Sequence, residues 1–107
     1  MKINTIEYIH NLASNGKIRF KKHALIRVVE RNIKIKEIEE ALKTSRIIES
    51  YPEDKPLESH LLLGTTKEAR QLHIVVALDK NSEYIWIVTA YDPDKAMWNR
   101  TLTKRKL

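Results

Sequence analysis

Apolar residues recur at helical spacing through the first 45 residues of the chain. This periodicity predicts three helices, over 4–14, 21–31 and 34–45. Asn4 is placed to cap the first helix, and Gly16 ends the run. The second helix also carries a polar face, because His23, Arg27 and Arg31 recur every four residues and stack on one side. Its other side is a broad apolar arc that we expect to face the core: Leu25, Ile26, Val28, Val29 and Ile33.

After residue 45 the apolar period becomes that of strands. The pattern predicts four strands, over 46–51, 59–64, 69–79 and 82–92. The short link 80–82 predicts an antiparallel hairpin between the last two, and Pro93 is placed to begin a short C-terminal helix. We therefore expect an α+β fold with two to three N-terminal helices packed on a three- to four-stranded antiparallel sheet.

Size and charge narrow the class of protein. A chain of 107 residues is expected to form one domain, 1–107. The net charge of +6 and the pI near 9.6 suit a polyanionic partner such as nucleic acid. The segment 99–107 is a basic tail, for which a solvated tail and an electrostatic docking role are both open. With no membrane span, no signal peptide and no cysteine in the sequence, we expect a soluble protein of the cytoplasm that does not engage a membrane.

The residue types also limit the chemistry. The two glycines are isolated, so no P-loop or dinucleotide fingerprint can be written. The four histidines lack paired ligand spacing and a carboxylate cluster, so we expect neither a metal site nor a cofactor. The remaining set, Arg, Lys, His and Tyr, can cleave RNA, because the 2′-hydroxyl is an internal nucleophile and the protein need only move protons and stabilise charge.

Several motifs occur as an ordered set: HALIRVVER, YPEDKP, RQLHIVVA and TAYDPDKAMW. Over residues 20–98 this set resembles an uncharacterised bacterial and archaeal domain family placed among the RelE/ParE-like toxins, with BrnT- and MqsR-like relatives. The resemblance implies a metal-independent endoribonuclease that cleaves mRNA, often on the ribosome. It also implies a cognate antitoxin encoded nearby, of zinc-ribbon or other DNA-binding type. Gln71 departs from the family, which commonly has proline there.

The positions that match the family's motifs supply the candidate catalytic residues. In the leading hypothesis Arg27 and Arg70 hold the scissile phosphate, and His73 is the general acid or base. His23 or Tyr91 takes the complementary proton-transfer role. The candidate RNA-binding residues are Arg31, Tyr51, Trp98 and Arg100.

Each of these assignments has a structural alternative. His73 can be a half-buried histidine with one hydrogen bond, and Arg27 and Arg31 can be solvated charges. Trp98 can be a core anchor. The whole chain can be a non-catalytic basic binding module, an inactive toxin-like fold, or a gyrase-directed toxin like some ParE-type members. Convergence of Arg27, Arg70 and His73 on an open groove would favour catalysis, whereas separate ion pairs would favour a binding module.

Overall fold

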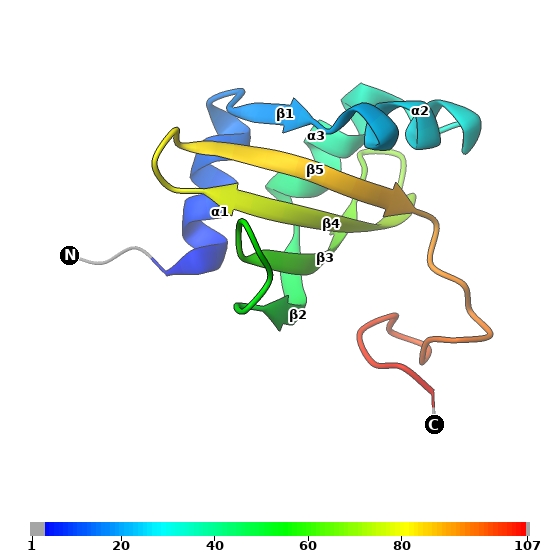
Figure 1. Ribbon diagram of the computed structural model, residues 1–107. Helices are drawn as coiled ribbons and strands as arrows, with labels where there is room; N and C mark the ends of the chain where they lie inside the picture. Colours follow the sequence, from blue (N-terminus) through cyan, green and yellow to red (C-terminus); the bar gives the residue numbers. More distant parts are fainter. Residues whose placement is uncertain (1–3, 107) are drawn as a thin grey trace.

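The computed structural model describes residues 4–106, which form three helices and five strands (Figure 1). The helices are α1 (Thr5–Ser14), α2 (Lys22–Glu30) and α3 (Ile35–Lys43). The strands are β1 (Ile18–Phe20), β2 (Arg46–Tyr51), β3 (Ser59–Thr65), β4 (Gln71–Asp79) and β5 (Tyr84–Tyr91). The α+β class, the three N-terminal helices and the four predicted strands are confirmed. The Asn4 cap is confirmed too, since its side chain accepts from the Glu7 amide at 2.9 Å.

The strands form one mixed sheet in the order β1-β5-β4-β3-β2. The β4–β5 hairpin is antiparallel as predicted, but β1 pairs in parallel with β5. The prediction of three to four strands, all antiparallel, was therefore wrong in two respects. The sheet has a fifth strand, β1, and this strand runs parallel to its neighbour β5. β1 has only three residues, too few for a period-two signal, and its partner is far along the chain, with Ile18 opposite Ile85.

A bulge in β5 decides which of its side chains enter the core. Val75 pairs with Thr89 and Val76 with Ile87, so Val88 has no partner across the strand pair. The alternation of β5 shifts by one residue at this point. Ile85, Ile87 and Ala90 consequently all face the helices, and the residues between them face the opposite side. We call these two sides the helix face and the open face of the sheet.

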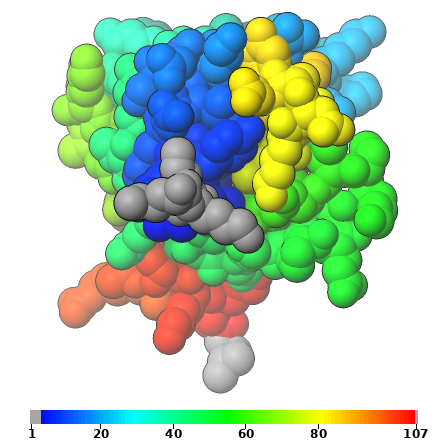
Figure 2. Space-filling model, turned by 90° about the vertical axis from the view of Figure 1, so that its left-hand side faces the viewer, coloured from blue at the N-terminus to red at the C-terminus, as the bar shows by residue number. Residues whose placement is uncertain are grey.

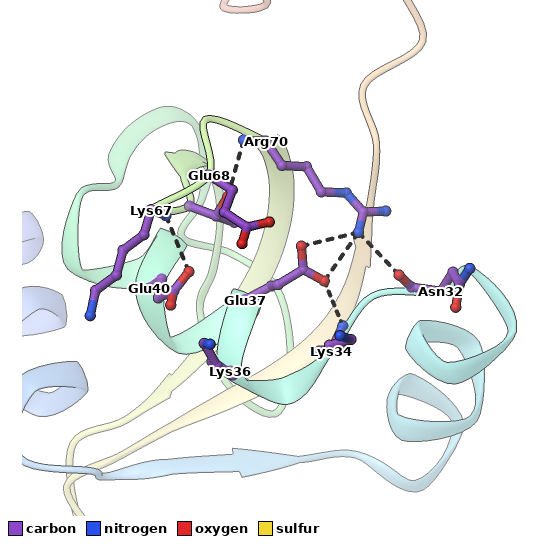
Figure 3. A pocket seen from close by; sticks show the side chains of 9 residues that line it. Asn32, Lys34, Lys36, Glu37, Glu40, Lys67, Glu68 and Arg70 are labelled. Carbon is purple, nitrogen blue, oxygen red and sulfur yellow. Dashed lines mark hydrogen bonds and ion pairs between the residues drawn. The ribbon is translucent and has the colours of Figure 1, made fainter.

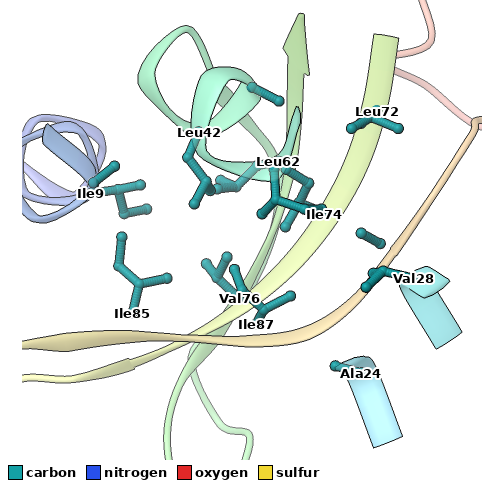
Figure 4. Close-up of a cluster of buried hydrophobic side chains, with 14 of the residues drawn as sticks. Ile9, Ala24, Val28, Leu42, Leu62, Leu72, Ile74, Val76, Ile85 and Ile87 are labelled. Atoms are coloured by element: carbon teal, nitrogen blue, oxygen red, sulfur yellow. The ribbon is translucent and has the colours of Figure 1, made fainter. Parts of the chain in front are cut away.

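The main hydrophobic core fills the space between the helices and the helix face (Figure 4). Ile9 of α1, Leu42 of α3 and Ile74 of β4 are among its fully buried side chains. α3 lies so close to β3 that a Cβ on Gly64 would stand 2.1 Å from the Ala41 carbonyl oxygen. Only glycine fits at this crossing.

α2 packs on β5 through a narrow stripe rather than the broad arc we expected. Ala24 and Val28 are buried, whereas Leu25, Ile26 and Val29 are 40%, 46% and 69% exposed. The prediction that the whole apolar arc faces the core was therefore wrong. The helix covers the far edge of the sheet, where only one stripe of its surface meets a strand.

Residues 94–106 form a segment that we call the C-terminal strap, which crosses the open face. The predicted short helix is absent, because the chain makes one turn, with the Met97 and Trp98 amides donating to the Asp94 carbonyl, and then bends away. Trp98 and Leu102 are buried against Leu61 and Leu63. Figure 2 shows the strap, in orange and red, as a layer along one side of the molecule.

The strap includes most of the basic tail 99–107, of which Leu107 lies outside the described residues. Trp98 takes the core-anchor role. Among residues 4–106, no helix has the length and hydrophobicity needed to cross a membrane.

Candidate functional site

His73 lies fully buried beneath the strap. Its Nε2 is 2.8 Å from the Leu102 carbonyl oxygen, and its Nδ1 has no hydrogen-bond partner among the described residues. A carbonyl oxygen only accepts, so Nε2 carries the proton and Nδ1 is an unused acceptor. Leu102 reaches this position with a left-handed backbone, φ +62°. The left-handed backbone of Leu102 and the unpaired Nδ1 of His73 each cost free energy of folding, and the two lie next to each other.

Two aromatic rings enclose the imidazole. Tyr91 of β5 and Trp98 of the strap meet it edge-on, with ring centroids 5.4 Å and 4.5 Å away. Burial lowers the pKa of His73, opposed by its bond to the Leu102 carbonyl, so the ring is held neutral. Burial also raises the pKa of Tyr91, which keeps its hydroxyl protonated.

A carboxylate and a guanidinium lie on the same face of the sheet. The Tyr51 hydroxyl donates to Glu49, and the Arg105 Nε donates to the same carboxylate at 3.1 Å. These two contacts, the Tyr51 bond first, lower the pKa of Glu49. Arg105 also lies over the Trp98 ring at 4.7 Å and ties the strap to β2. We call the whole group the His73 cluster: Glu49, Tyr51, His73, Tyr91 and Arg105.

The His73 cluster contains the groups that proton transfer on a phosphodiester requires. It holds a neutral imidazole with a free lone pair, the Tyr91 hydroxyl, and the Tyr51 hydroxyl and Arg105 guanidinium that both contact Glu49. The strap covers it, and beside the strap is a hollow of about 360 Å³. Trp98 and Leu102, the two strap residues next to His73, line this hollow, together with the exposed cations Lys95, Arg100 and Lys106.

Arg70 does not belong to this cluster (Figure 3). Its Nη2 donates to Asp92 at 2.8 Å, and its Nη1 donates to Glu37 at 3.1 Å and to the Asn32 carbonyl at 3.0 Å. The hydrogen bond to Asp92 is the main cause that raises the pKa of Arg70. Arg70 thus contacts three segments: the residues that follow α2, helix α3, and the end of β5. It also borders a separate hollow of about 600 Å³.

The alternation of the strand explains this separation. Arg70 and Leu72 share the parity of the helix face, while His73 points to the open face. The polar stripe on α2 is divided as well. His23 and Arg27 are exposed, while Arg31 Nη1 donates to the Ala90 carbonyl at 2.8 Å and to Thr89 at 3.1 Å, beyond the point where β1 ends.

The predicted convergence of Arg27, Arg70 and His73 is therefore not formed. The structure brings together only three of the predicted site residues with His73: Tyr51, Tyr91 and Trp98. Sequence reasoning missed Glu49 and Arg105. Glu49 could have been found, because it shares the strand parity of Tyr51. Arg105 could not, because its place depends on the path of the strap.

No curated protein and no solved structure matches the chain. A family model matches residues 20–92, which include four residues of the His73 cluster but not Arg105 or the rest of the strap. Because this match covers well over half of the sequence, the chain belongs to the family described as Domain of unknown function (DUF4258).

Proposed function

We propose that this protein is the toxin of a toxin–antitoxin pair and a metal-independent endoribonuclease that cleaves mRNA at the His73 cluster. The resemblance to RelE/ParE-like toxins supports the class. The observation that carries the proposal is the unpartnered Nδ1 of His73, whose ring meets the Tyr91 ring edge-on. A buried acceptor without a partner costs about 1–3 kcal/mol, and use as a proton acceptor in catalysis accounts for keeping it.

The groups of the cluster suffice for the reaction. His73 Nδ1 takes the proton of the 2′-hydroxyl, whose oxygen attacks the adjacent phosphorus. Arg105 stabilises the charge that develops on the phosphorane. The bond to the 5′-oxygen breaks as the Tyr91 hydroxyl donates a proton to it, which leaves a 2′,3′-cyclic phosphate and a 5′-hydroxyl. Arg105 here takes the phosphate-binding role that the sequence suggested for Arg70.

RNA can reach His73 only when the strap moves. The strap is the least supported layer of the fold, since only two of its side chains, Trp98 and Leu102, are buried hydrophobic residues. In this proposal the structure is the closed form. Opening breaks the bond from His73 to the Leu102 carbonyl. Closure over the bound strand then returns Arg105 to the cluster and brings the cations of the neighbouring hollow, Arg100 among them, to the flanking phosphates.

A cognate antitoxin belongs to the same proposal. Leu25, Ile26 and Val29 form a contiguous exposed apolar strip on α2, beside the exposed His23 and Arg27. Apolar surface of this kind is typical of protein interfaces. An antitoxin helix seated on this strip would bury it, and Val29→Glu should then weaken the complex while leaving the folded toxin intact.

The test is controlled expression in a bacterial host, with growth and mRNA integrity followed together. Wild type should arrest growth and fragment mRNA, and His73→Ala should reduce cleavage by about 10²- to 10⁴-fold. His73→Gln retains a donor toward Leu102 and checks that the loss is not one of folding. His23→Ala, a histidine exposed on α2, is the matched control and should remain active.

Two outcomes would contradict the ribonuclease. Arrest with intact mRNA would point to another target such as gyrase. Bound but uncut RNA would favour the second candidate, a non-catalytic RNA-binding module. The observation that favours this module is the engagement of Arg70 by two carboxylates, Glu37 and Asp92, away from His73.

A further inference from the structure

β1 and β5 carry a second group of side chains on the open face, which we call the basic-aromatic strip: Lys17, Arg19, Lys21, Tyr84 and Trp86. The three cations flank or occupy β1 at alternate positions, and the two rings alternate on β5. Arg19 lies 4.0 Å from the Tyr84 ring centroid and 5.9 Å from that of Trp86. Lys17 is 5.4 Å from Tyr84, and Lys21 is 5.0 Å from Trp86.

The cations of the strip are not neutralised. Among residues 4–106, every ion pair uses other side chains, and Lys17, Arg19 and Lys21 are all exposed. Asp79 is opposite Tyr84 in the sheet, but its carboxylate accepts from the Asn81 and Ser82 amides. The strip differs in this from Arg70, whose charge is fully engaged.

The positive charges of the strip affect the ionisation of Tyr84. Contact with the Arg19 guanidinium, then the charges of Arg19 and Lys17, lower the pKa of Tyr84. Trp86 is only partly buried, so part of its ring faces solvent. Partly exposed aromatic rings interleaved with unpaired cations are the combination that proteins use to hold nucleic acid single strands.

A hollow on the open face lies between the strip and the His73 cluster, since Val88, one of its lining residues, stands between Trp86 and Tyr91 on β5. The hollow has a volume of about 240 Å³ and is lined by the apolar Val75, Ala77 and Val88 and by two cations and one carboxylate, Lys21, Lys55 and Asp54. Tyr91 follows Trp86 by five residues on β5, which corresponds to roughly 17 Å along a strand. The strip and the His73 cluster are therefore separated by the length of a few nucleotides.

We propose that the basic-aromatic strip binds a single-stranded nucleic acid, with phosphates on Lys17, Arg19 and Lys21 and a base stacked on Trp86. That the strand is RNA rests on the proposed function. A single strand is favoured over a duplex because only unstacked bases present their faces to an aromatic ring. The strip would hold the strand upstream or downstream of the scissile phosphate and so guide it along the open face.

The binding test uses a fluorescein-labelled 12-nucleotide oligouridine with 2′-O-methyl groups, which the proposed reaction cannot cut. Fluorescence anisotropy gives its affinity for the whole protein at several salt concentrations. Trp86→Ala should weaken binding roughly 5- to 150-fold, the range that one stacked base contributes. Trp86→Phe, which keeps a ring, should retain most of the affinity.

The cations are tested by a pair of double variants with equal change in charge. Lys17→Gln/Lys21→Gln should reduce the slope of log K against log salt by about 1.4, the value for two lost phosphate contacts on a single strand. Lys36→Gln/Lys43→Gln removes two exposed cations from α3, on the other side of the sheet, and should leave the slope unchanged. Circular dichroism of each variant confirms that it is folded.

Three results would overturn the strip as a binding site: no binding by the wild type at low salt, equal losses in the two double variants, or a self-complementary duplex of the same length bound as tightly as the single strand. Equally tight binding of the deoxy-oligonucleotide of the same sequence would support the strip as a single-strand site but contradict its preference for RNA. Binding at the strip without cleavage of unmodified RNA would contradict the proposed ribonuclease alone, so the two proposals fail separately.

Discussion

The two faces of the sheet are built from the same strands and yet differ in almost every physical property. On the helix face, β4 presents Leu72, Ile74 and Val76, all fully buried against three helices. On the open face, the same strand presents His73 and the half-buried Val75, covered in part by a strap with no regular structure. The contrast indicates that the helix face specifies the fold, while the open face is where charged and titratable groups can be accommodated.

The largest effect is expected where the helix face is tightest. In Gly64→Ala the new Cβ would stand 2.1 Å from the Ala41 carbonyl oxygen, so α3 must move away from β3. We expect a loss of about 3 kcal/mol or more in the free energy of unfolding, or no soluble protein. Urea denaturation measures it. Gly16→Ala is the comparison: its Cβ would meet no atom within 4 Å, so only the left-handed backbone, φ +70°, should cost it about 1 kcal/mol. Equal stability of the Gly64 variant and wild type would contradict the close packing of α3.

A substitution that weakens the contact of the strap with the open face should affect the protein locally. Trp98→Ala removes the main apolar contact of the strap and should cost up to about 3 kcal/mol. We expect part of this cost to appear as local detachment rather than global unfolding. Trypsin should then cut after Lys95 and Arg100 well before it cuts the sheet. Simultaneous loss of both regions would show that the strap and the sheet form one cooperative unit.

The pH dependence of stability should locate the buried imidazole. Burial lowers the pKa of His73, so the unfolded chain binds a proton that the folded chain resists. The stabilisation is complete above about pH 6.5, the ordinary histidine value, and is lost as the pH falls below it. Denaturation midpoints between pH 7.5 and 5.5 should fall more steeply for wild type than for His73→Gln. Parallel curves would mean that His73 is open to solvent.

The smallest effect is expected in the turn before β4, which belongs to neither face. Ala69 has φ +69° and is exposed, so its side chain contributes strain and little packing. Ala69→Gly should raise the free energy of unfolding by about 0.5 kcal/mol, since relief of strain outweighs the greater freedom of the unfolded chain. Thermal denaturation detects the change, and destabilisation would contradict the left-handed conformation.

The helix face could be predicted from sequence far better than the open face. Leu72, Ile74, Val76 and Leu78 alternate without interruption, and such a pattern reports burial by itself. The position of Arg70 relative to His73 also follows from strand parity, which shows that a three-residue separation places two side chains on opposite faces. The prediction that Arg70 and His73 converge was wrong because it did not take this alternation into account.

The strap and β1 could not be predicted by the same means. Pro93 and Asp94 are typical of a helix start, but burial of Trp98 and Leu102 on the sheet overrides that local preference. β1 forms because it pairs with the edge of β5. The residues that stabilise it as a strand are therefore distant in sequence, since Ile18 pairs with Ile85, 67 residues away. The basic-aromatic strip was not predicted, although its cations and rings stand at alternate positions in two short segments.

The parallel pairing of β1 with β5 has a consequence for biosynthesis. During translation the residues of β1 leave the ribosome long before those of β5, so the nascent chain holds Lys17, Arg19 and Lys21 with no rings beside them. Contacts this distant in sequence form late in folding. The basic-aromatic strip, made from the first and last strands, can therefore exist only once nearly all of the sheet has been synthesised, which delays the appearance of its binding capacity until the chain is almost complete.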